Sequence, residues 1–537
     1  MTENESKQSG VELKVEGPEL KRPVTSQTTR LLELCEKIEV FHTPDGQQFA
    51  AVPVDQHREN WLIDSREFKS WVRREFYKKF GMAPSSFGLQ EAIDTLLARA
   101  QFDGETCPVF LRMGSSKDNI YVDLANAAWE VVEISKSGWK VIKDSPIKFR
   151  RSKKMKELPS PVRGEDRSGI VRLRSFLNVE SLNDFRLLVA FIVNAYNPQG
   201  PYLALVLYGE QGTAKSTTVK VIRALIDPSE IPLRREPKTS DDLLVSAQHN
   251  WVVAIDNMSF LPDWLSDDLC RLATGGGISK RSLYTNDEET VLEAKRPIIL
   301  NGISEFVARG DLASRSITIN LPMISEENRK CEKTFWVDFT KAHPFLLACL
   351  FDAVSMALRD EDSIVQEKKL RMADAWQWVT ASEMAFGWER GEMVEAFRAN
   401  QESANDAVLN GSIFYRYILE LSKSGWSGTP SDLLSKLNSM RDHHDTYEKG
   451  WPNRPRGLTD HLRRINPALR IAGIEVILDG KTSGSNSERR ITIGKLPKSY
   501  DAYDAKKNDV GRDVSDECDA KIPEFAFDGH KQFLNGK

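Results

Sequence analysis

The chain has 537 residues, enough for three or four domains of about 150 residues each. A net charge of −4, from 74 basic and 78 acidic residues, excludes a uniformly basic nucleic-acid coat but not a local basic groove. No apolar run reaches the roughly 18 residues of a membrane span, and the N-terminus lacks the apolar core of a secretory signal. Six scattered cysteines without a CxxC pair argue against a zinc ribbon or a disulfide scaffold. We therefore expect a cytoplasmic protein of several domains with no membrane partner.

The pattern of apolar residues predicts a multidomain α/β protein. Residues 1–28 are polar and contain two prolines, which indicates a disordered tail. Residues 29–165 mix strand-like pieces with a helical face at Leu89, Ala92 and Leu96, and predict an α/β N-terminal adaptor domain. Strand and helix signals alternate over 166–325, as in a parallel α/β sheet. A helical region at 326–440, a small α-then-β unit at 441–495 and an acidic disordered tail at 496–537 follow.

A run of cations follows the N-terminal domain. Six of the nine residues in 148–156 are basic: Lys148, Arg150, Arg151, Lys153, Lys154 and Lys156. Prolines and a glycine come next, which favours a linker or a domain edge. Two interpretations stay open: a solvated basic connector, or a contact with a nucleic-acid phosphate backbone.

The strongest motif is a glycine-containing loop between an apolar strand and a helix. The strand YLALVLY (202–208) leads into GEQGTAKST (209–217), with Lys-Ser at the head of the helix. Backbone N–H groups of such loops surround nucleotide phosphates, and the helix N-terminus adds partial positive charge. We expect Lys215 to reach the γ-phosphate of ATP and Ser216 to bind Mg²⁺. The predicted nucleotide-binding residues are Gly209, Glu210, Gln211, Gly212, Thr213, Ala214, Lys215, Ser216 and Thr217.

One position of this loop departs from the pattern GxxxxGK[ST]. Ala214 stands where glycine normally precedes the lysine. Alanine resists positive φ, so the motif is compatible with phosphate binding if Ala214 is not left-handed. Gly212 supplies conformational freedom two residues earlier.

A second buried strand, WVVAI (251–255), ends in Asp256 and Asn257. In phosphate-loop ATPases an acid at this strand end holds Mg²⁺, so Asp256 is the predicted metal residue together with Ser216. A second acid normally follows and polarises the attacking water. Asn257 can orient a water molecule but cannot accept its proton. Two interpretations follow: an ATPase in which Asn257 positions water, or a slow one whose bound nucleotide sets the conformation.

The segment 272–322 carries the remaining candidates of the central region. LATGGGISKRSLY (272–284) precedes an acidic turn at 286–289 and a returning strand, which predicts a β-hairpin with Lys280 and Arg281 near its start. The strand PIIL (297–300) ends in Asn301, whose amide can hydrogen-bond a γ-phosphate or the attacking water; a strand-end turn is the alternative. Arg315 precedes another apolar strand, where a surface salt bridge that caps the strand end is one interpretation.

The order of these parts resembles the core of superfamily 3 helicases. It is similar to the ATPases in primase–helicase proteins of phages, satellites and poxviruses. It is also similar to a bacterial family found with mobile elements and described as ATP-binding or helicase-like. The strings that carry this likeness are GEQGTAKS (209–216), DNMS (256–259), LCRLATGGG (269–277), RPIILNGI (296–303) and DLASR (311–315).

The resemblance implies an AAA+-like ring, usually a hexamer, with ATP bound between subunits. Arg315 would then be an arginine finger that reaches a neighbour's γ-phosphate, and Asn301 a polar sensor residue. In these helicases the hairpin carries basic residues to DNA in a central channel. Lys280 and Arg281 would correspond, although the acidic turn departs from this pattern because it repels phosphates.

The unit at 441–495 predicts a winged-helix-like fold. A basic helical segment with Arg456, Arg463 and Arg464 precedes two strand-like pieces joined by a Gly/Ser-rich turn. A helix followed by a hairpin wing is an arrangement in which the helix enters the major groove of DNA. A docking surface without DNA is the alternative.

We therefore expect a Mg²⁺-dependent ATPase that forms a ring and acts on single-stranded or forked DNA, as a replicative helicase of a mobile genetic element. The catalytic candidates are Lys215, Asp256, Asn257, Asn301 and Arg315. The alternative is a nucleotide-gated oligomeric scaffold or loader with slow, DNA-independent hydrolysis. The sequence offers no primase or nuclease signature, so priming or cutting would fall to a separate partner.

Overall fold

The computed structural model describes residues 26–164, 169–276, 278–281, 289–292, 294–303, 307, 310–366, 370–410, 412–441, 451–481 and 489–496. The predicted tails lie outside these residues except for 26–28 and Leu496, and so does the acidic hairpin turn except for Glu289. The chain divides into two compact units, Met1–Ala404 and Asn405–Lys537, which are described separately. The predicted multidomain α/β class is confirmed, with helices and several sheets in the described residues.

The first unit opens with a four-stranded sheet of order β3-β2-β1-β4 and three helices. α3 (Ser86–Phe102) buries Leu89, Ala92 and Leu96, the face that its apolar spacing predicts. α1 begins at Gln27, inside the predicted tail, because the Ser26 hydroxyl accepts a hydrogen bond from the Thr29 amide at 3.0 Å and caps the helix. The remaining elements are α1 (Gln27–Leu34), β1 (Glu39–His42), β2 (Gln48–Val54), β3 (His57–Leu62), α2 (Arg66–Phe80) and β4 (Glu105–Thr106).

A second, antiparallel sheet of order β6-β7-β8-β9 follows in the same unit. Its inward residues, among them Met113, Val122 and Ile134, belong to the same hydrophobic core as the central sheet. One core therefore runs across residue 165, where the sequence predicts a domain boundary. The elements are β5 (Val109–Phe110), β6 (Met113–Ser116), β7 (Asn119–Asp123), β8 (Val131–Ser135), β9 (Gly138–Ile142) and β10 (Lys148–Phe149).

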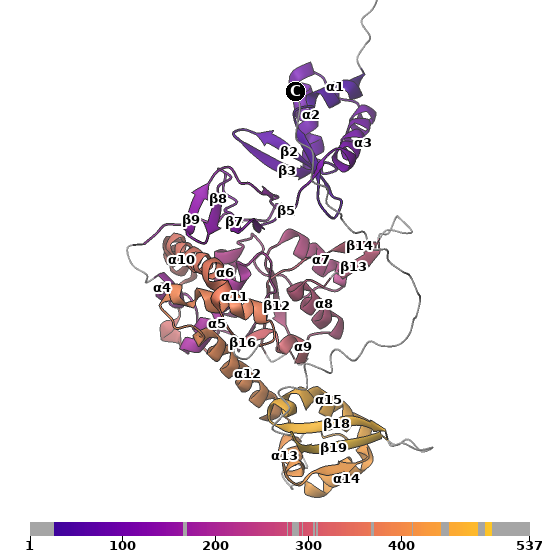
Figure 1. Ribbon diagram of the computed structural model, residues 1–537, viewed down its shortest axis with the longest axis vertical. Helices are drawn as coiled ribbons and strands as arrows, with labels where there is room; N and C mark the ends of the chain where they lie inside the picture. Colours follow the sequence, from indigo (N-terminus) through magenta and orange to yellow (C-terminus); the bar gives the residue numbers. More distant parts are fainter. Residues whose placement is uncertain are drawn as a thin grey trace, which may run out of the picture. The chain divides into compact units, whose positions relative to one another are not determined.

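The central sheet has the order β12-β15-β11-β16, and all of its pairings are parallel. Successive strand residues face opposite sides: Leu205 and Leu207 pack with α5 and α6, whereas Val206 and Tyr208 pack with α7 and α8. Figure 1 shows these helix pairs on the two sides of the sheet. The elements are α4 (Gly169–Arg174), α5 (Leu182–Ala195), β11 (Ala204–Tyr208), α6 (Lys215–Ile226), α7 (Ser240–His249), β12 (Val253–Met258), α8 (Asp263–Thr274), β15 (Ile298–Gly302), α9 (Gly310–Ala313) and β16 (Ser316–Asn320).

The predicted hairpin is present between α8 and β15. β13 (Ile278–Arg281) pairs antiparallel with β14 (Glu289–Leu292), with Lys280 opposite Thr290. Gly275 ends α8 in the left-handed region at φ 90°, which glycine adopts at low cost. The backbone of Lys280 and Arg281 thus lies in the first hairpin strand.

Helices complete the first unit. α10 (Glu332–Asp360) buries Phe339, Leu347 and Phe351 in the main core. Within the described residues, the segment 332–363 alone has the length and composition of a membrane span, and 61% of its apolar window is buried in the fold. Core helices of globular proteins have the same properties. The remaining elements are η1 (Glu326–Asn328), η2 (Glu361–Ser363), α11 (Ala373–Ser382), η3 (Glu383–Phe386) and α12 (Glu392–Asn410).

The second unit is a helical cluster with a three-stranded antiparallel sheet of order β17-β19-β18. Ile418, Leu437, Leu462 and Ile493 share one core, so the helices before residue 440 pack with the predicted 441–495 unit. In chain order the elements are α13 (Tyr415–Ser424), β17 (Trp426–Gly428), α14 (Pro430–Met440), α15 (Pro455–Ile471), β18 (Ile474–Lys481) and β19 (Arg489–Lys495).

Candidate nucleotide-binding site

The loop 209–216 lies at the carboxyl end of β11 and leads directly into α6. Gly209 and Gly212 have φ angles of 151° and 92°. A Cβ at Gly209 would come within 2.7 Å of Thr213 Oγ1 and 2.9 Å of Leu321 O, so only glycine fits there. The two glycines therefore allow a tight turn of the backbone at this point.

Ala214 is left-handed, with φ 59° and ψ 28°. The condition set for this residue, that it is not left-handed, is therefore not met. An L-residue in this region costs roughly 1–2 kcal/mol, which the surrounding contacts must offset. The loop thus has a left-handed residue at position 214 although this residue is alanine and not glycine.

Asn178, between α4 and α5, holds the loop from outside. Its Nδ2 donates to Thr213 O at 3.0 Å and to Pro322 O at 2.7 Å. Thr213 Oγ1 in turn donates to Glu210 O at 3.0 Å, and Thr213 is buried. No motif in the sequence indicates this role of Asn178, because the residue is far from the loop in sequence.

Lys215 begins α6 and folds back over the loop. Its Nζ donates to Gly209 O at 2.6 Å and to Glu210 O at 2.7 Å. Burial lowers the pKa of Lys215, and the Asp256 carboxylate acts in the opposite direction. A cation at the centre of a loop of backbone N–H groups forms a binding site for phosphate oxygens.

Ser216 and Asp256 come together from α6 and β12. Ser216 Oγ lies 3.5 Å from Asp256 Oδ1, and both residues are half-buried. A hydroxyl and a carboxylate are oxygen ligands of the kind that Mg²⁺ prefers when nucleotide phosphates and water complete its octahedron. The predicted metal residues therefore fit Mg²⁺ in donor type and proximity.

Asn257 and Asn301 form a pair at the neighbouring strand ends. The Asn257 amide donates to Asn301 Oδ1 at 2.8 Å, and Asn257 has φ 58°. Asn301 is 1% exposed, and its Nδ2 has no hydrogen-bond partner among the described residues. A buried amide without a partner is costly, so this donor is suited to a ligand that approaches the sheet edge.

Arg315 lies at the opposite end of the sheet. β16 runs parallel to β11 with Ser316 beside Ala204, and Arg315 precedes it. Arg315 Nη1 contacts Asp311 Oδ2 at 3.0 Å. Arg371 also binds Asp311, and its Nη1 donates to Ser314 Oγ at 2.8 Å. The structure therefore groups Lys215, Ser216, Asp256, Asn257 and Asn301 at one sheet edge and separates Arg315 from them.

Asp311 is not among the residues predicted from the sequence, although its signal is present in the spacing. Asp311 and Arg315 are four residues apart across the end of α9. Burial alone would raise the pKa of Asp311, but the Cys270 thiol and the Arg315 and Arg371 guanidiniums together lower it. Burial also raises the pKa of the adjacent Cys270 thiol to about 11.

The nucleic-acid candidates occupy two separate elements. Only the backbone of Lys280 and Arg281 is described, in β13. Arg456, Arg463 and Arg464 are exposed on α15, opposite the face that buries Leu458 and Leu462. Within α15, Arg463 lies 3.3 Å from Asp460, and Arg464 lies 3.1 Å from His461.

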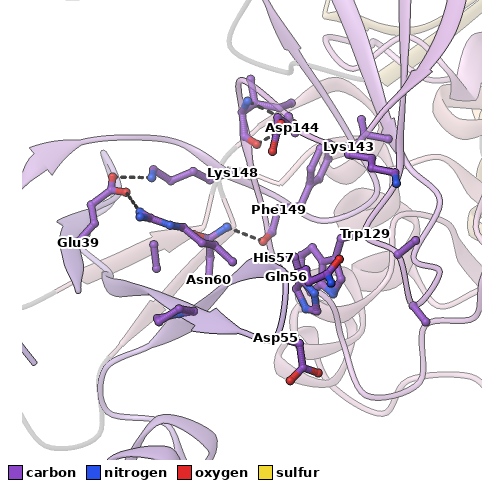
Figure 2. A pocket seen from close by; sticks show the side chains of 18 residues that line it. Glu39, Asp55, Gln56, His57, Asn60, Trp129, Lys143, Asp144, Lys148 and Phe149 are labelled. Atoms are coloured by element: carbon purple, nitrogen blue, oxygen red, sulfur yellow. Dashed lines mark hydrogen bonds and ion pairs between the residues drawn. The ribbon is translucent and has the colours of Figure 1, made fainter. Parts of the chain in front are cut away.

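A cavity of about 810 Å³ lies elsewhere in the first unit, between β3 and the segment 127–149 (Figure 2). Lys148 contacts Glu39 at 2.6 Å, and Asn60 donates to Phe149 O at 2.9 Å. The charges of Lys148 and Glu39 therefore neutralise each other. None of the predicted catalytic, nucleotide-binding or metal residues lines this cavity, whereas Lys148 of the basic run does.

The first unit thus presents a Gly-Lys-Ser loop and an acid at the carboxyl edge of a parallel sheet, the arrangement of phosphate-loop proteins. Residues 169–407 match the model for an actinomycete integrative conjugative element replication protein, and residues 414–507 match the model for the C-terminal domain of the same family, AICE RepA. The chain belongs to this family of replication proteins of a mobile element. The expected relation to mobile-element proteins is confirmed.

Two solved structures are also similar to parts of the chain. One is described as the active helicase Cch of SCCmec type IV, with 12% identity, 86% of this chain and 93% of that chain covered, and a TM-score of 0.42. The other is the apo C-terminal region of NrS-1, with 12% identity, 87% and 99% covered, and a TM-score of 0.38. No protein of curated function matches this chain.

Proposed function

We propose that the chain is a Mg²⁺-dependent ATPase that forms a ring and acts on DNA, as a superfamily 3-like replicative helicase of its mobile element. One observation carries the proposal: Arg315 lies at the sheet end opposite the loop that holds Lys215. An arginine in that position can meet a nucleotide phosphate only on another subunit. A closed ring repeats such a head-to-tail contact at every interface.

In this proposal the loop N–H groups and Lys215 bind the β- and γ-phosphates of ATP. Ser216 and Asp256 hold Mg²⁺, which neutralises developing phosphate charge when bound. The free Asn301 Nδ2 donates to the γ-phosphate or to the attacking water, and the exposed Asn257 side chain orients that water. Positioning without a strong base can suffice for phosphoryl transfer, as with the glutamine of small GTPases.

The strand order supports an AAA+-like core within this proposal. Arg234 forms an isolated parallel bridge with Ile255, which adds one further chain segment beyond β12. The sheet then contains five parallel segments with β11, the strand before the loop, between β15 and β16. The motifs at the ends of β11, β12 and β15 converge in such an arrangement.

The second unit supports a winged-helix role in DNA binding. Its order of helix, strand, two helices and a two-stranded hairpin ends in β18 and β19, which would form the wing. Arg456 and Arg463 are seven residues apart on α15, so they project from nearly the same side of the helix. We assign this exposed face to DNA phosphates or bases.

A nucleotide-gated scaffold or loader is the second candidate. Asn257 cannot take a proton from water, and Arg315 is already paired with Asp311 within its own chain. Both features favour slow hydrolysis, with ATP holding the oligomer together. A separate primase or nuclease would then do the chemistry on DNA. Either function takes place in the cytoplasm.

Steady-state ATP hydrolysis with and without single-stranded DNA distinguishes the two candidates. Lys215→Ala serves as the blank, because the variant lacks the phosphate-binding cation. Stimulation by DNA of about tenfold or more supports the motor, and strand displacement then follows as the direct assay. A slow rate that DNA does not change supports the scaffold. Full activity in Lys215→Ala would overturn the assignment of the loop itself.

A further inference from the structure

The basic run 148–156 lies where the N-terminal sheets meet the central α/β sheet. Most of its cations are already paired: Lys148 with Glu39 at 2.6 Å, Arg151 with Asp123 at 2.7 Å, Lys153 with Glu67 at 2.5 Å and Lys154 with Glu230 at 2.5 Å. These contacts join segments that are far apart in sequence. The four paired cations therefore act as structural connectors.

Arg150 differs from its neighbours in the run. Its Nη2 donates to the backbone carbonyl of Gln248 at 2.9 Å, and it forms no ion pair with a carboxylate of the described residues. Burial lowers the pKa of Arg150, while the more distant Asp45 acts in the opposite direction. A half-buried guanidinium without a counter-charge is unfavourable unless an anion approaches it.

Arg234 supplies a second such cation to the same pocket. Its Nε is buried and has no hydrogen-bond partner among the described residues. Burial lowers the pKa of His249, and the charges of Arg150 and Arg234 lower it further. The two guanidiniums therefore lie close enough to act on one imidazole, which stays neutral at neutral pH.

These residues line a pocket of about 490 Å³, here called the Arg150 pocket. Its lining combines cationic side chains with the apolar side chains of Trp61, Leu62 and Leu111. One carboxylate, that of Glu67, also lines the pocket, where it is paired with Lys153. Trp61 Nε1 donates to Glu59 Oε2 at 3.0 Å, which fixes the indole. Cationic and aromatic side chains together suit a phosphate that carries a nucleobase, because bases stack on aromatic rings.

We propose that the Arg150 pocket binds single-stranded nucleic acid, with one backbone phosphate between Arg150 and Arg234 and an adjacent base against Trp61. A strand is favoured over a single nucleotide because Lys153 and Lys154 extend the set of cations into solvent. Their side chains are 80% and 54% exposed, so their present ion pairs are weak and can be exchanged for phosphates. This site is separate from both the β13–β14 hairpin and α15.

The pocket also borders the proposed metal site through the backbone. The Arg234 amide donates to Ala254 O at 3.1 Å, and Arg234 O accepts from the Asp256 amide at 2.7 Å. A bound nucleic-acid strand that moves the Arg234 side chain therefore also acts on the backbone segment beside β12. This segment is hydrogen-bonded to the amide of Asp256, the proposed metal residue. Binding itself requires no ATP, so it can be tested without the proposed hydrolysis.

The test uses the full-length protein without nucleotide and a photoreactive, fluorescent oligothymidylate. We expect the double variant Arg150→Gln/Arg234→Gln to bind about tenfold or more weakly, and the slope of log affinity against log salt to fall by about 0.7 per lost phosphate contact. Lys341→Gln removes one exposed charge on α10, away from the pocket, and is the control for charge loss elsewhere. It should leave affinity unchanged. In the wild type, the peptide that contains Trp61 should be crosslinked.

Unchanged affinity in the double variant, together with crosslinks only in other segments, would overturn the proposal. Displacement of the crosslink by thymidine monophosphate at equal phosphate concentration would also overturn it, since the pocket would then be a site for free nucleotides. Should the double variant fail to fold, Lys153→Gln tests the same pocket, because the Lys153 side chain is exposed. The slope of log affinity against log salt should then fall by about 0.7. Either failure leaves the ATPase proposal intact, because the binding assay contains no ATP.

Discussion

Arg315→Ala gives the sharpest test of the ring. β16 pairs with β11 over five residues, and Arg315 precedes the first of them, so it lies about 20 Å of strand length from Gly209, where the loop begins. This separation is more than an arginine side chain spans, and the residue cannot act on its own loop. If Arg315 is an arginine finger, its loss should lower the rate of ATP hydrolysis by about a thousandfold or more.

Mixing two inactive variants makes the prediction quantitative. Lys215→Ala has an intact Arg315 but a defective loop, whereas Arg315→Ala has the reverse. In equal, randomly assembled mixtures, half of the loops are intact, and half of those face an intact arginine. The mixture should therefore recover about a quarter of the wild-type rate.

Two outcomes would refute this reasoning. Near-wild-type hydrolysis by Arg315→Ala would mean that Arg315 is only the partner of Asp311. No recovery in rings shown by native mass spectrometry to be mixed would mean that the two residues do not meet across subunits. Arg371→Ala is the control, because Arg371 also binds Asp311 but lies outside the proposed chemistry, and should retain activity.

Three further changes test the structure itself. Ala214→Gly should raise the free energy of unfolding by about 0.5–1 kcal/mol, because relief of the left-handed alanine exceeds the added entropy of glycine; a lower urea midpoint would contradict this. Asp227→Asn should cost about 3–5 kcal/mol, since the buried Arg112 and Arg223, at 3.1 Å each, would lose their counter-charge; unchanged urea unfolding would rule it out. Burial lowers the pKa of His343 from 6.5 to about 4. The neutral imidazole's contribution to the free energy of unfolding is therefore fully present above pH 6.5 and is lost as the pH falls toward 4. The loss should be about 2 kcal/mol between pH 7 and 5, and His343→Gln should lack it.

The local chemistry of the loop was accessible from the sequence because its residues are contiguous. An apolar strand, glycines and Lys-Ser at a helix start specify one local geometry, and the structure forms it. The hairpin β13–β14 was likewise predictable from a turn between two short strands. The same local reasoning was wrong for Ala214, because it depended on avoiding a conformation that the contacts of Asn178 and Thr213 help to stabilise.

Contacts between distant segments were not accessible in this way. Nothing in the run 148–156 distinguishes Arg150 from Arg151, yet one meets a carbonyl and the other a carboxylate. The shared core across residue 165 arises because β6–β9 bury their apolar side against the helices of the central region. Burial of this kind depends on which elements pack together, and a single sequence gives the apolar pattern without the partner.

The choice between a fast motor and a slow scaffold depends on the asparagine pair. Asn301 Oδ1 is occupied by the Asn257 amide at 2.8 Å, so Nδ2 is held as the free end of a buried side chain. A fixed donor beside the loop can stabilise the negative charge that develops on a phosphate, and this stabilisation does not require a base. Asn257 stands where a second acid normally polarises the attacking water. It can compensate for that acid only if its side chain orients the water. A loss in Asn301→Ala larger than that in Asn257→Ala would therefore indicate that charge stabilisation, rather than activation of water, limits the rate.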